Sequence, residues 1–247
     1  MEIYDDPEAD FEVERKADNS PLTVADRRAN HTICDMLAAT GIPILSEEMA
    51  AAPYDTRAGW ERLWIVDPLD GTKEFIGRRD DFTVNIALVE RGVPVAGVVY
   101  LPVFATLYVA VKGEGSFRTD GVKPGSDASL DSLTAAGIRL PLPQEERPYT
   151  CVASMSHLND DTRRFIDELR IAHPDLTTVS RGSSIKICLV AEGRADIYPR
   201  LAPTMEWDTA AGHAVALMAG CDIVRADDNT PLRYNKRDLH NPHFIVK

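Results

Sequence analysis

Basic side chains are in short supply in this chain. Its 247 residues include 27 Lys and Arg against 39 Asp and Glu, which gives a formal charge of −12. Such a chain repels polyphosphate backbones and anionic surfaces at long range, so no nucleic-acid polymer is expected as a partner. A small anionic ligand would need local cations or a bound metal ion.

Motifs of several large enzyme classes are missing as well. The sequence contains no G-x-x-x-x-G-K-[ST] loop, no G-x-G-x-x-G fingerprint, no G-x-S-x-G elbow and no H-E-x-x-H pair. These absences argue against nucleoside-triphosphate, dinucleotide, serine-hydrolase and zincin chemistry.

Cysteine is rare, with four residues far apart and no C-x-x-C pair. This spacing favours neither a zinc knuckle nor a disulfide framework, so we expect reduced, packed cysteines. No basic segment followed by an apolar leader stands at the N-terminus. The expected location is therefore the cytoplasm, with peripheral association at the inner membrane as an alternative.

One stretch without charge, residues 92–111, is long enough to span a bilayer as a helix. Pro94, Gly97 and Pro102 interrupt it, and valine and aromatic side chains are frequent in it. Because proline disfavours a helix interior, two buried strands joined by a turn near Pro102 fit better. We therefore expect no transmembrane segment.

Strand-like and helical patterns alternate along the chain, which predicts a mixed α/β fold. A first helix is expected to start near Pro21, because Thr23 and Asp26 form a capping-box signature. Further helices are expected at residues 160–171, 185–191 and 209–219. Strands are expected at residues 42–45, 63–66, 83–89, 93–100, 107–111, 149–154, 177–179 and 195–198.

The densest chemical signal is the segment DPLDGT at residues 67–72. An apolar strand ends at Asp67, and Asp70 follows after a proline. Because proline restricts φ and Gly71 permits a tight turn, both carboxylates can face one point at the carboxyl end of the strand. With the Leu69 carbonyl between them, they offer the oxygen ligands that Mg²⁺ prefers. The alternative is a turn with a helix-capping aspartate.

Two other segments carry acidic residues at the ends of elements. Glu47 and Glu48 follow an apolar strand, and Asp208 stands where a buried helix begins. Together with Asp67 and Asp70, Glu47 and Asp208 could hold two or three divalent ions, as metal-assisted phosphoryl transfer requires. An exposed loop is the alternative for the two glutamates, and helix capping is the alternative for Asp208.

Few groups could receive a phosphate. Gly71 and Thr72 would bind an anion through their backbone amides if they open a helix. In the segment GSSIK, Ser183 and Lys186 offer hydroxyl and ammonium groups at another helix start. A serine cap beside a solvated lysine is an equal alternative there.

The chain resembles a known family of phosphatases. The segments DPLDGT (67–72) and WDTAAG (207–212) resemble the paired signature of the magnesium-dependent, lithium-sensitive inositol monophosphatase superfamily. The resemblance runs from about Tyr4 to the C-terminus. Five segments resemble the 3′(2′),5′-bisphosphate nucleotidases of the CysQ type: KADNSPLT (16–23), LSEE (45–48), DPLDGTKEFI (67–76), FTVNIAL (82–88) and GSSIK (182–186).

This resemblance implies an alternating αβαβα layered sandwich with two subdomains. It implies hydrolysis of the small bisphosphate nucleotide 3′-phosphoadenosine 5′-phosphate to AMP and phosphate, by water that bound Mg²⁺ activates. The sulfated precursor of that nucleotide is implied as a further substrate, which places the activity in sulfate assimilation. Two or three Mg²⁺ ions are the implied cofactors.

The resemblance also assigns roles to residues. It implies metal ligands at Glu47, Asp67, the Leu69 carbonyl, Asp70 and Asp208. It implies a catalytic group made of Asp26 and Thr72, which polarise the attacking water, together with Glu47. It implies substrate-binding positions at Gly71, Thr72, Lys73, His157, Ser183, Lys186, Arg200 and Asp208.

A boundary between two subdomains is expected between residues 112 and 148, where composition shifts toward Gly, Pro, Ser and charge. Residues 1–147 would form the first subdomain and carry the main metal site. Residues 148–247 would complete the metal and nucleotide site. The sequence does not indicate an oligomeric state.

Two alternative functions stay open. One is an inositol-phosphate or fructose-1,6-bisphosphate phosphatase of the same superfamily. The second-phosphate site separates the two, because a bisphosphate nucleotide should require Lys186 and inositol monophosphate should not. The other alternative is a non-catalytic metal or nucleotide sensor. The presence of Asp26 and Thr72 favours catalysis over a sensor, because binding alone does not need a water-activating pair.

Overall fold

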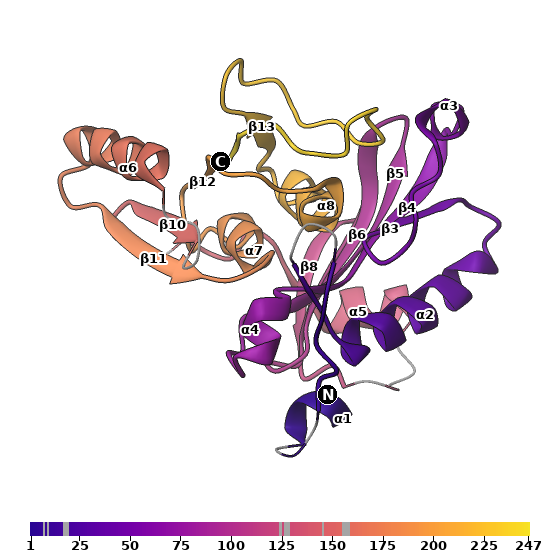
Figure 1. Cartoon of the computed structure of the whole chain (residues 1–247). Coiled ribbons are helices and arrows are strands. Elements are labelled where there is room, and N and C mark those ends of the chain that lie inside the picture. The colour runs from indigo at the N-terminus through magenta and orange to yellow at the C-terminus, as the bar shows by residue number, and fades with distance from the viewer. Residues whose placement is uncertain are drawn as a thin grey trace.

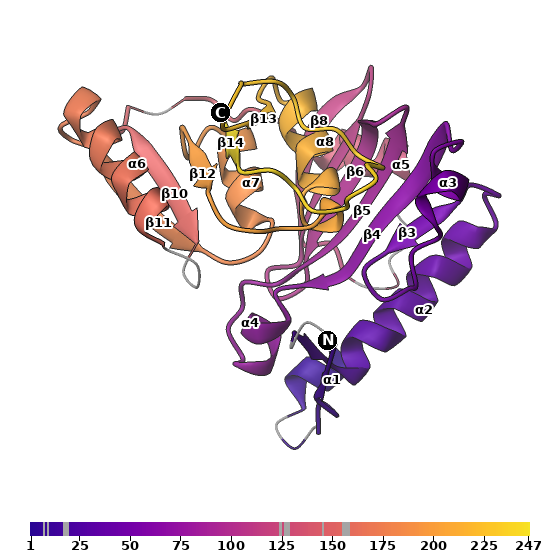
Figure 2. The same ribbon diagram turned by 45° about the horizontal axis from the view of Figure 1, so that its top comes forward.

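Helices and sheets alternate in five layers in the computed structural model, which describes residues 1–6, 8, 10–16, 20–123, 125, 129–144, 146–154 and 159–247. Figures 1 and 2 show these layers side by side, which confirms the predicted αβαβα sandwich. The layers follow in the order α6 (Asp160–Ala172), the small sheets, α7 (Ile185–Ala191) with α8 (Ala210–Met218), the large sheet, and α2 (Val24–Ala38).

The large sheet has seven strands in the order β3-β4-β5-β6-β7-β8-β9. Only β3 and β4 run parallel, and each other neighbouring pair is antiparallel. The strands are β3 (Ile44–Ser46), β4 (Arg62–Asp70), β5 (Thr83–Glu90), β6 (Val93–Leu101), β7 (Thr106–Val111), β8 (Gly115–Asp120) and β9 (Ile138–Arg139).

One face of this sheet is buried more deeply than the other. Along β5, fully buried residues alternate with half-buried ones, as expected for a strand whose successive side chains point to opposite faces. Ala87 and Val89 belong to the deeply buried core that includes Ala211 and Ala214 of α8. Helix α8 contacts β5 and β6, whereas α2 contacts β4 and β3. The large sheet therefore lies between these two helices (Figure 2).

Small side chains allow α8 to approach the sheet closely. A Cβ atom added at Gly97 in β6 would lie 2.6 Å from Cβ of Ala214 and 2.7 Å from the carbonyl oxygen of Ala211. Distances this short are not compatible with the observed packing, so glycine is required at this position. The contact fixes the height of α8 above the sheet, and α8 follows directly on the segment that contains Asp208.

The second half of the chain builds two smaller sheets. Strands β10 (Thr150–Ser154) and β11 (Thr177–Arg181) pair in parallel, with α6 between them in the sequence. The strands β12 (Tyr198–Arg200), β14 (Phe244–Val246) and β13 (Ile223–Arg225) form an antiparallel sheet in that order.

The strand predicted at residues 195–198 is shifted in the structure, because β12 covers Tyr198–Arg200. Asp196 instead uses its carboxylate to accept a hydrogen bond from the backbone N–H of Thr150 at 2.6 Å. Only Ile197 makes an isolated bridge, to Cys151 of β10.

Other predicted elements agree with the structure or differ at their ends. Helix α7 spans the predicted residues 185–191, and β4 extends beyond the predicted 63–66 to Asp70. The first helix starts at Val24 rather than near Pro21, because Pro21 and Leu22 form strand β2 against β1 (Glu14–Arg15). Elements that the sequence reading did not predict include α1 (Glu2–Asp5), β1, β2, α3 (Tyr54–Arg57), β8, α5 (Leu130–Ala136) and β9.

Residues 92–111 form the paired strands β6 and β7, as predicted. Across the described ranges, none of the helices has the length and apolar character needed to cross a membrane. All four cysteines are free; Cys151 and Cys188 are buried, as expected for packed cysteines, whereas Cys34 and Cys221 are only partly buried.

Candidate active site

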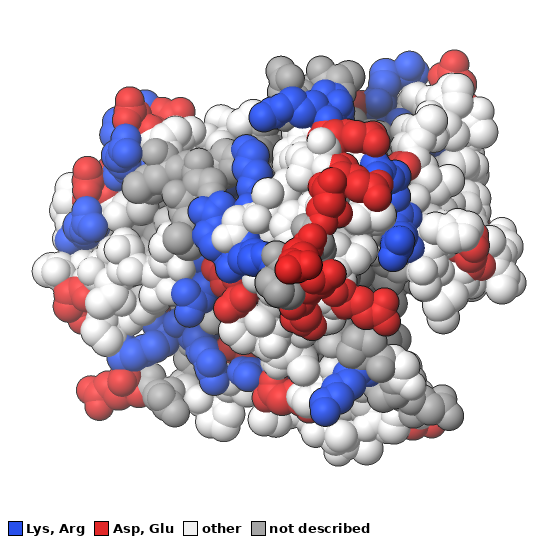
Figure 3. Space-filling model, turned by 60° about the horizontal axis from the view of Figure 1, so that its bottom comes forward, with Lys and Arg blue, Asp and Glu red and all other residues white. Residues whose placement is uncertain are grey.

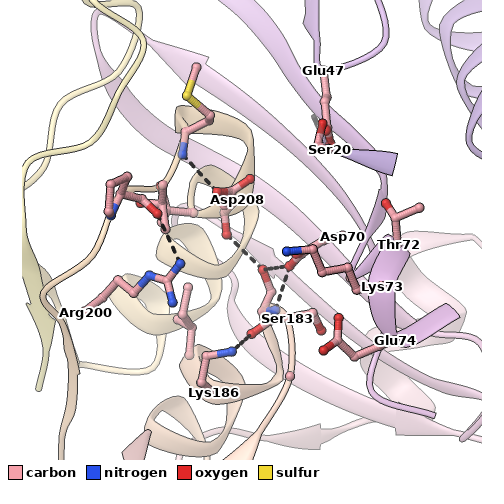
Figure 4. Close-up of a pocket in the computed structure, with 18 of the residues that line it drawn as sticks. Ser20, Glu47, Asp70, Thr72, Lys73, Glu74, Ser183, Lys186, Arg200 and Asp208 are labelled. Atoms are coloured by element: carbon pink, nitrogen blue, oxygen red, sulfur yellow. Dashed lines mark hydrogen bonds between the residues drawn. The ribbon is translucent and has the colours of Figure 1, made fainter. Parts of the chain in front are cut away.

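A cavity of about 410 Å³ opens where the carboxyl end of β4 and helix α4 (Thr72–Ile76) meet α7, β12 and the 3₁₀ helix η1 (Glu206–Asp208). This volume lies in the range of small-molecule sites. The predicted site residues that line it are Glu47, Asp70, Gly71, Thr72, Lys73, Ser183, Lys186, Arg200 and Asp208. Figure 4 shows Lys186 and Arg200 together on one side, with Glu47, Asp70 and Asp208 further along the wall.

A β-bulge places the two aspartates of the DPLDGT segment on the same face of β4. Asp67 pairs with Asn85 and Asp70 pairs with Thr83, so three steps along β4 correspond to two steps along β5. Residues three apart in a regular strand point to opposite faces, and one extra residue cancels that difference. The prediction of a turn after Asp67 is therefore wrong, although the two carboxylates do share a face. The strand continues to Asp70, and the bulge brings the carboxylates together.

Asp67 is fully buried next to the cavity and is not one of the described residues that line it. Its Oδ1 accepts a hydrogen bond from the backbone N–H of Leu69 at 3.0 Å. Burial raises the pKa of Asp67 well above its usual range, and the charges of Glu47, Asp70 and Asp208 raise it further. Four carboxylates are thus close enough to repel one another, and a cation among them would relieve this repulsion.

Asp70 is held through one of its two oxygens. Its Oδ2 accepts hydrogen bonds from the N–H and the hydroxyl of Ser184 at 2.8 and 3.1 Å, and from Nδ2 of Asn85 at 3.3 Å. Burial raises the pKa of Asp70, while the charge of Lys186 and these hydrogen bonds lower it. Since Asp70 lines the cavity, its Oδ1 is the oxygen available to a ligand.

Asp208 caps a helix end and also lines the cavity. Its Oδ2 accepts a hydrogen bond from the N–H of Met205 at 2.9 Å, at the start of η1. The capping interpretation is therefore correct for this oxygen, although the capped element is η1 and not α8. Burial raises the pKa of Asp208 to about 8, and the charge of Asp70 raises it as well.

The two glutamates after β3 are not in an exposed loop. The Glu47 side chain is 22% exposed and that of Glu48 is 7% exposed, so the exposed-loop alternative is wrong. The Lys16 ammonium lies 2.6 Å from one carboxylate oxygen of each. Burial raises the pKa of Glu48, whereas the hydrogen bond and charge of Lys16 lower it. A protein cation thus occupies the position between these carboxylates.

Asp26 completes the predicted capping box and also contacts Thr72. Its Oδ2 accepts a hydrogen bond from the N–H of Thr23 at 2.7 Å, and the Thr23 hydroxyl caps α2 in return. The other oxygen, Oδ1, lies 3.2 Å from the hydroxyl of Thr72. That hydroxyl is also 3.3 Å from the Leu69 carbonyl oxygen. The capping box therefore holds Asp26 in an orientation that leaves Oδ1 for Thr72.

Gly71 adopts a left-handed backbone conformation with φ of 96°, immediately before α4. A Cβ atom here would lie 3.1 Å from the carbonyl oxygen of Asp81. Both facts require glycine, as the sequence predicted for a tight turn. Thr72 does open a helix, and Lys73 stands exposed at the rim of the cavity.

Lys186 and Arg200 supply positive charge inside the cavity. Lys186 is buried, its Nζ donates to the Ser183 carbonyl oxygen at 2.6 Å, and burial lowers its pKa to about 8. Within the described part of the chain, Nε of Arg200 and Oγ of Ser183 are buried polar atoms without a hydrogen-bond partner. Such atoms are unfavourable unless a ligand or water satisfies them.

The charges on the protein surface are also unevenly distributed. Figure 3 shows clusters of Lys and Arg beside clusters of Asp and Glu on one face of the molecule. A chain with a formal charge of −12 therefore still presents local cations, which a small anionic ligand needs.

One predicted site residue, His157, lies outside the described residues. Other residues that line the cavity were not identified from the sequence, including Tyr198, Thr204, Met205 and His240. These residues come from loops and strand ends without a recognisable spacing, so no sequence signal could have found them.

The donor set fits a divalent cation, although the side chains are not arranged around one. Glu47, Asp67, Asp70 and Asp208 offer hard oxygen ligands, as Mg²⁺ prefers. Within the part of the chain that the structure describes, no three acidic, His or Cys side chains converge as a complete metal site. The observed bonds explain this, because Glu47 binds Lys16, Asp70 binds Ser184 and Asp208 binds the Met205 N–H.

Comparisons with known proteins agree with this geometry. The family model "Inositol monophosphatase family" matches residues 2–246. The 3′(2′),5′-bisphosphate nucleotidase CysQ of Salmonella typhimurium is 42% identical over 249 residues, which cover 100% of this chain and 92% of the relative.

Solved structures show the same relationship. The crystal structure of CysQ from Bacteroides thetaiotaomicron matches with a TM-score of 0.92 and 53% identity, covering 100% of this chain and 90% of that chain. An IMPase/NADP phosphatase complexed with Mg²⁺ and phosphate shares the fold alone, at 22% identity and a TM-score of 0.70, over 95% of this chain and 80% of that chain. The chain therefore belongs to the inositol monophosphatase family, within its CysQ group.

Proposed function

We propose that this protein is a magnesium-dependent 3′(2′),5′-bisphosphate nucleotidase, which hydrolyses 3′-phosphoadenosine 5′-phosphate to AMP and phosphate. The full-length similarity to CysQ nucleotidases supports the reaction class. The observation that carries the substrate class is the cavity itself, in which Lys186 and Arg200 line the same wall as the carboxylates. A substrate with two phosphates could place one at the carboxylates and the other at these cations.

The carboxylate group would hold the metal. Glu47, Asp67, Asp70, Asp208 and the Leu69 carbonyl are the ligands we propose for two or three Mg²⁺ ions. When bound, Mg²⁺ lowers the pKa of a coordinated water and neutralises charge on phosphoryl oxygens. Asp67 and Asp208 are buried carboxylates with raised pKa values, so a cation would lower the cost of ionising them.

Thr72 and Asp26 would orient the attacking water. The Thr72 hydroxyl contacts both Asp26 Oδ1 and the Leu69 carbonyl oxygen, and it lines the cavity. When the Thr72 hydroxyl donates its hydrogen bond to Asp26, its oxygen can accept a hydrogen bond from the attacking water. A relay would then pass the water proton to the Thr72 oxygen and the Thr72 proton to Asp26, which acts as the general base.

The phosphate to be removed would bind at the start of α4, through the backbone of Gly71 and Thr72 and the side chain of Lys73. The second phosphate would bind Lys186, Ser183 and Arg200. The buried Oγ of Ser183 and Nε of Arg200, which have no partner in the described structure, would then be satisfied. We include His157 and Asp208 among the nucleotide-binding positions because the family resemblance assigns them.

An inositol-phosphate or fructose-1,6-bisphosphate phosphatase is the second candidate, because the family includes such enzymes. The buried ammonium of Lys186 favours a substrate with two phosphates over inositol monophosphate. A monophosphate bound at α4 would leave this charge unpaired, and such a site discriminates strongly against a substrate that lacks the matching group.

The test is phosphate release from 3′-phosphoadenosine 5′-phosphate, inositol 1-phosphate and fructose 1,6-bisphosphate, each with Mg²⁺, with Mg²⁺ plus Li⁺, and with EDTA. We expect a strong preference for the nucleotide and loss of activity with Li⁺ or EDTA. Asp70→Asn keeps the side-chain size and should abolish release. Comparable rates on all three substrates would contradict the nucleotide assignment, and undiminished release in EDTA would contradict the metal dependence.

A further inference from the structure

Among the described residues, Ser184 is the one whose side chain hydrogen-bonds both Asp70, at the end of β4, and Asp208, in η1. Its hydroxyl lies 3.1 Å from Oδ2 of Asp70, at the end of β4, and 2.9 Å from the backbone carbonyl oxygen of Asp208, in η1. These partners are 114 and 24 positions away in the chain. Ser184 itself is only 2% exposed, so water does not substitute for these bonds.

The Ser184 hydroxyl has partners for both its donor and its acceptor capacity. A serine hydroxyl donates one hydrogen bond and accepts others. Nδ2 of Asn85 donates to Ser184 Oγ at 3.0 Å, so Ser184 can direct its own proton to Asp70 or to the Asp208 carbonyl. Asn85 is in turn oriented by the Thr83 hydroxyl, which lies 3.0 Å from its Oδ1. The chain Thr83, Asn85, Ser184 therefore leads both to Asp70 Oδ2 and to the Asp208 carbonyl oxygen.

These bonds distinguish the two oxygens of Asp70. Oδ2 receives the N–H and hydroxyl of Ser184 and Nδ2 of Asn85. No protein donor reaches Oδ1 among the residues that the structure describes, and Asp70 lines the cavity. A carboxylate with one oxygen fully engaged by protein donors has a fixed plane, so its second oxygen has a fixed direction.

We propose that Ser184 is a positioning residue, which sets the orientation of Asp70 relative to Asp208 and thereby the affinity of the cavity for a divalent cation. Ser184 lies next to Ser183, which belongs to the proposed phosphate site, but its hydroxyl contacts the Asp70 carboxylate and the Asp208 backbone carbonyl instead. This inference rests on the proposed function, because it treats Asp70 and Asp208 as metal ligands.

The test is calorimetric titration of the full-length protein with MgCl₂ in the absence of substrate, followed by kinetics with 3′-phosphoadenosine 5′-phosphate. In Ser184→Ala the backbone bond to Asp70 remains, and only the hydroxyl bonds are lost. We expect Mg²⁺ affinity to fall about 10- to 100-fold, as for other residues that orient metal ligands. Activity should recover as the Mg²⁺ concentration is raised, with the nucleotide KM at saturating Mg²⁺ unchanged.

Ser116→Ala is the matched control. Ser116 is also a fully buried serine, and in the described structure its hydroxyl has no hydrogen-bond partner. This variant should bind Mg²⁺ like the wild type. A second variant, Asn85→Ala, removes the donor to Ser184 Oγ together with its own 3.3 Å bond to Asp70 Oδ2, without altering α7. If Asn85 acts through Ser184, the losses in the double variant should be smaller than the sum of the single losses in free energy.

The outcomes separate the two proposals. If the wild type binds Mg²⁺ and Ser184→Ala binds it equally well, the positioning role is wrong while the metal-dependent function stands. If the wild type binds no Mg²⁺, both are wrong. If Ser184→Ala fails to fold by circular dichroism, Asn85→Ala decides, and an unchanged Mg²⁺ affinity in that variant overturns the proposal.

Discussion

The hydroxyl of Thr72 lies 3.2 Å from Oδ1 of Asp26, 46 positions away in the chain. Thr72 begins α4 and Asp26 stands in the first turn of α2, so two helix starts meet at this contact. The opposite oxygen of Asp26 completes the capping box with Thr23. A capping interaction that stabilises α2 thus also orients a group of the proposed active site.

Thr72→Val should lower kcat strongly while the protein stays folded. The substitution keeps the shape of the side chain and removes the hydroxyl between Asp26 and the cavity. Proton-transfer groups typically contribute about 100- to 10,000-fold, so a loss in this range is expected. Steady-state kinetics with 3′-phosphoadenosine 5′-phosphate checks it. Thr72→Ser, which keeps the hydroxyl, should retain most of the activity, and a valine variant with a wild-type rate would exclude the relay.

Lys186→Ala should raise the KM for the bisphosphate nucleotide much more than the KM for a monophosphate. The loss of a charge-assisted hydrogen bond corresponds to a change of about 10- to 100-fold. Kinetics on 3′-phosphoadenosine 5′-phosphate and inositol 1-phosphate give the comparison. Equal effects on both substrates would remove Lys186 from the second-phosphate role.

The pH dependence of nucleotide binding should reflect the protonation of Lys186. Burial lowers the pKa of Lys186 to about 8, so the free enzyme loses this positive charge as the pH rises through about 8. We expect kcat/KM for the bisphosphate to fall above this pH. Lys186→Arg should lose this fall, because arginine stays protonated. An unchanged pH profile in the arginine variant would assign the decline to another group.

The stability of the metal-free protein should decrease as the pH rises. The pKa of Asp208 is raised from 3.8 to about 8, and those of Asp67 and Asp70 are raised too. At a pH between the pKa of a carboxyl in the unfolded state and its higher pKa in the folded state, the folded state binds more protons. The free energy of unfolding therefore falls with increasing pH. For Asp208 the loss of stability begins near pH 4 and is complete above about pH 8, and Asp67 and Asp70 act in the same direction.

Thermal unfolding in EDTA at pH 5.5, 7 and 8.5 checks this prediction. Mg²⁺ should raise the Tm most at pH 8.5, where the carboxylates are ionised and a ligand that binds only the folded state stabilises it. Asp208→Asn should flatten the pH dependence. A Tm in EDTA that rises from pH 5.5 to 8.5 would contradict the prediction.

Gly97→Ala should destabilise the contact between β6 and α8. The added methyl group would lie 2.6 Å from Cβ of Ala214, and overpacking of this kind costs ~1–3 kcal/mol. Urea unfolding measures the change. Gly59→Ala is the control, because its new Cβ would meet nothing closer than 3.9 Å and should leave stability nearly unchanged. Equal stability of both variants would show that α8 can shift freely.

The arrangement of the proposed metal ligands could be predicted only in part. The sequence identified Asp67 and Asp70 as a pair, but it suggested a turn where the structure has a bulge in β4. Whether two aspartates share a face depends on the register with β5, and register is a property of the pair of strands. Lys16 between Glu47 and Glu48 likewise follows from the hairpin that places it there.

What the sequence determined by itself is local. Features of this kind depend on residues close together in the chain, because the backbone fixes their relative geometry. They are the strand and helix periodicities, the capping box of Thr23 and Asp26, the need for glycine at position 71 and the family signatures. Only the tertiary structure decided which oxygen of Asp70 stays available, because its partner Ser184 is 114 positions away. Such a contact arises where the residue before α7 meets the carboxyl end of β4, and no periodicity within either segment encodes it.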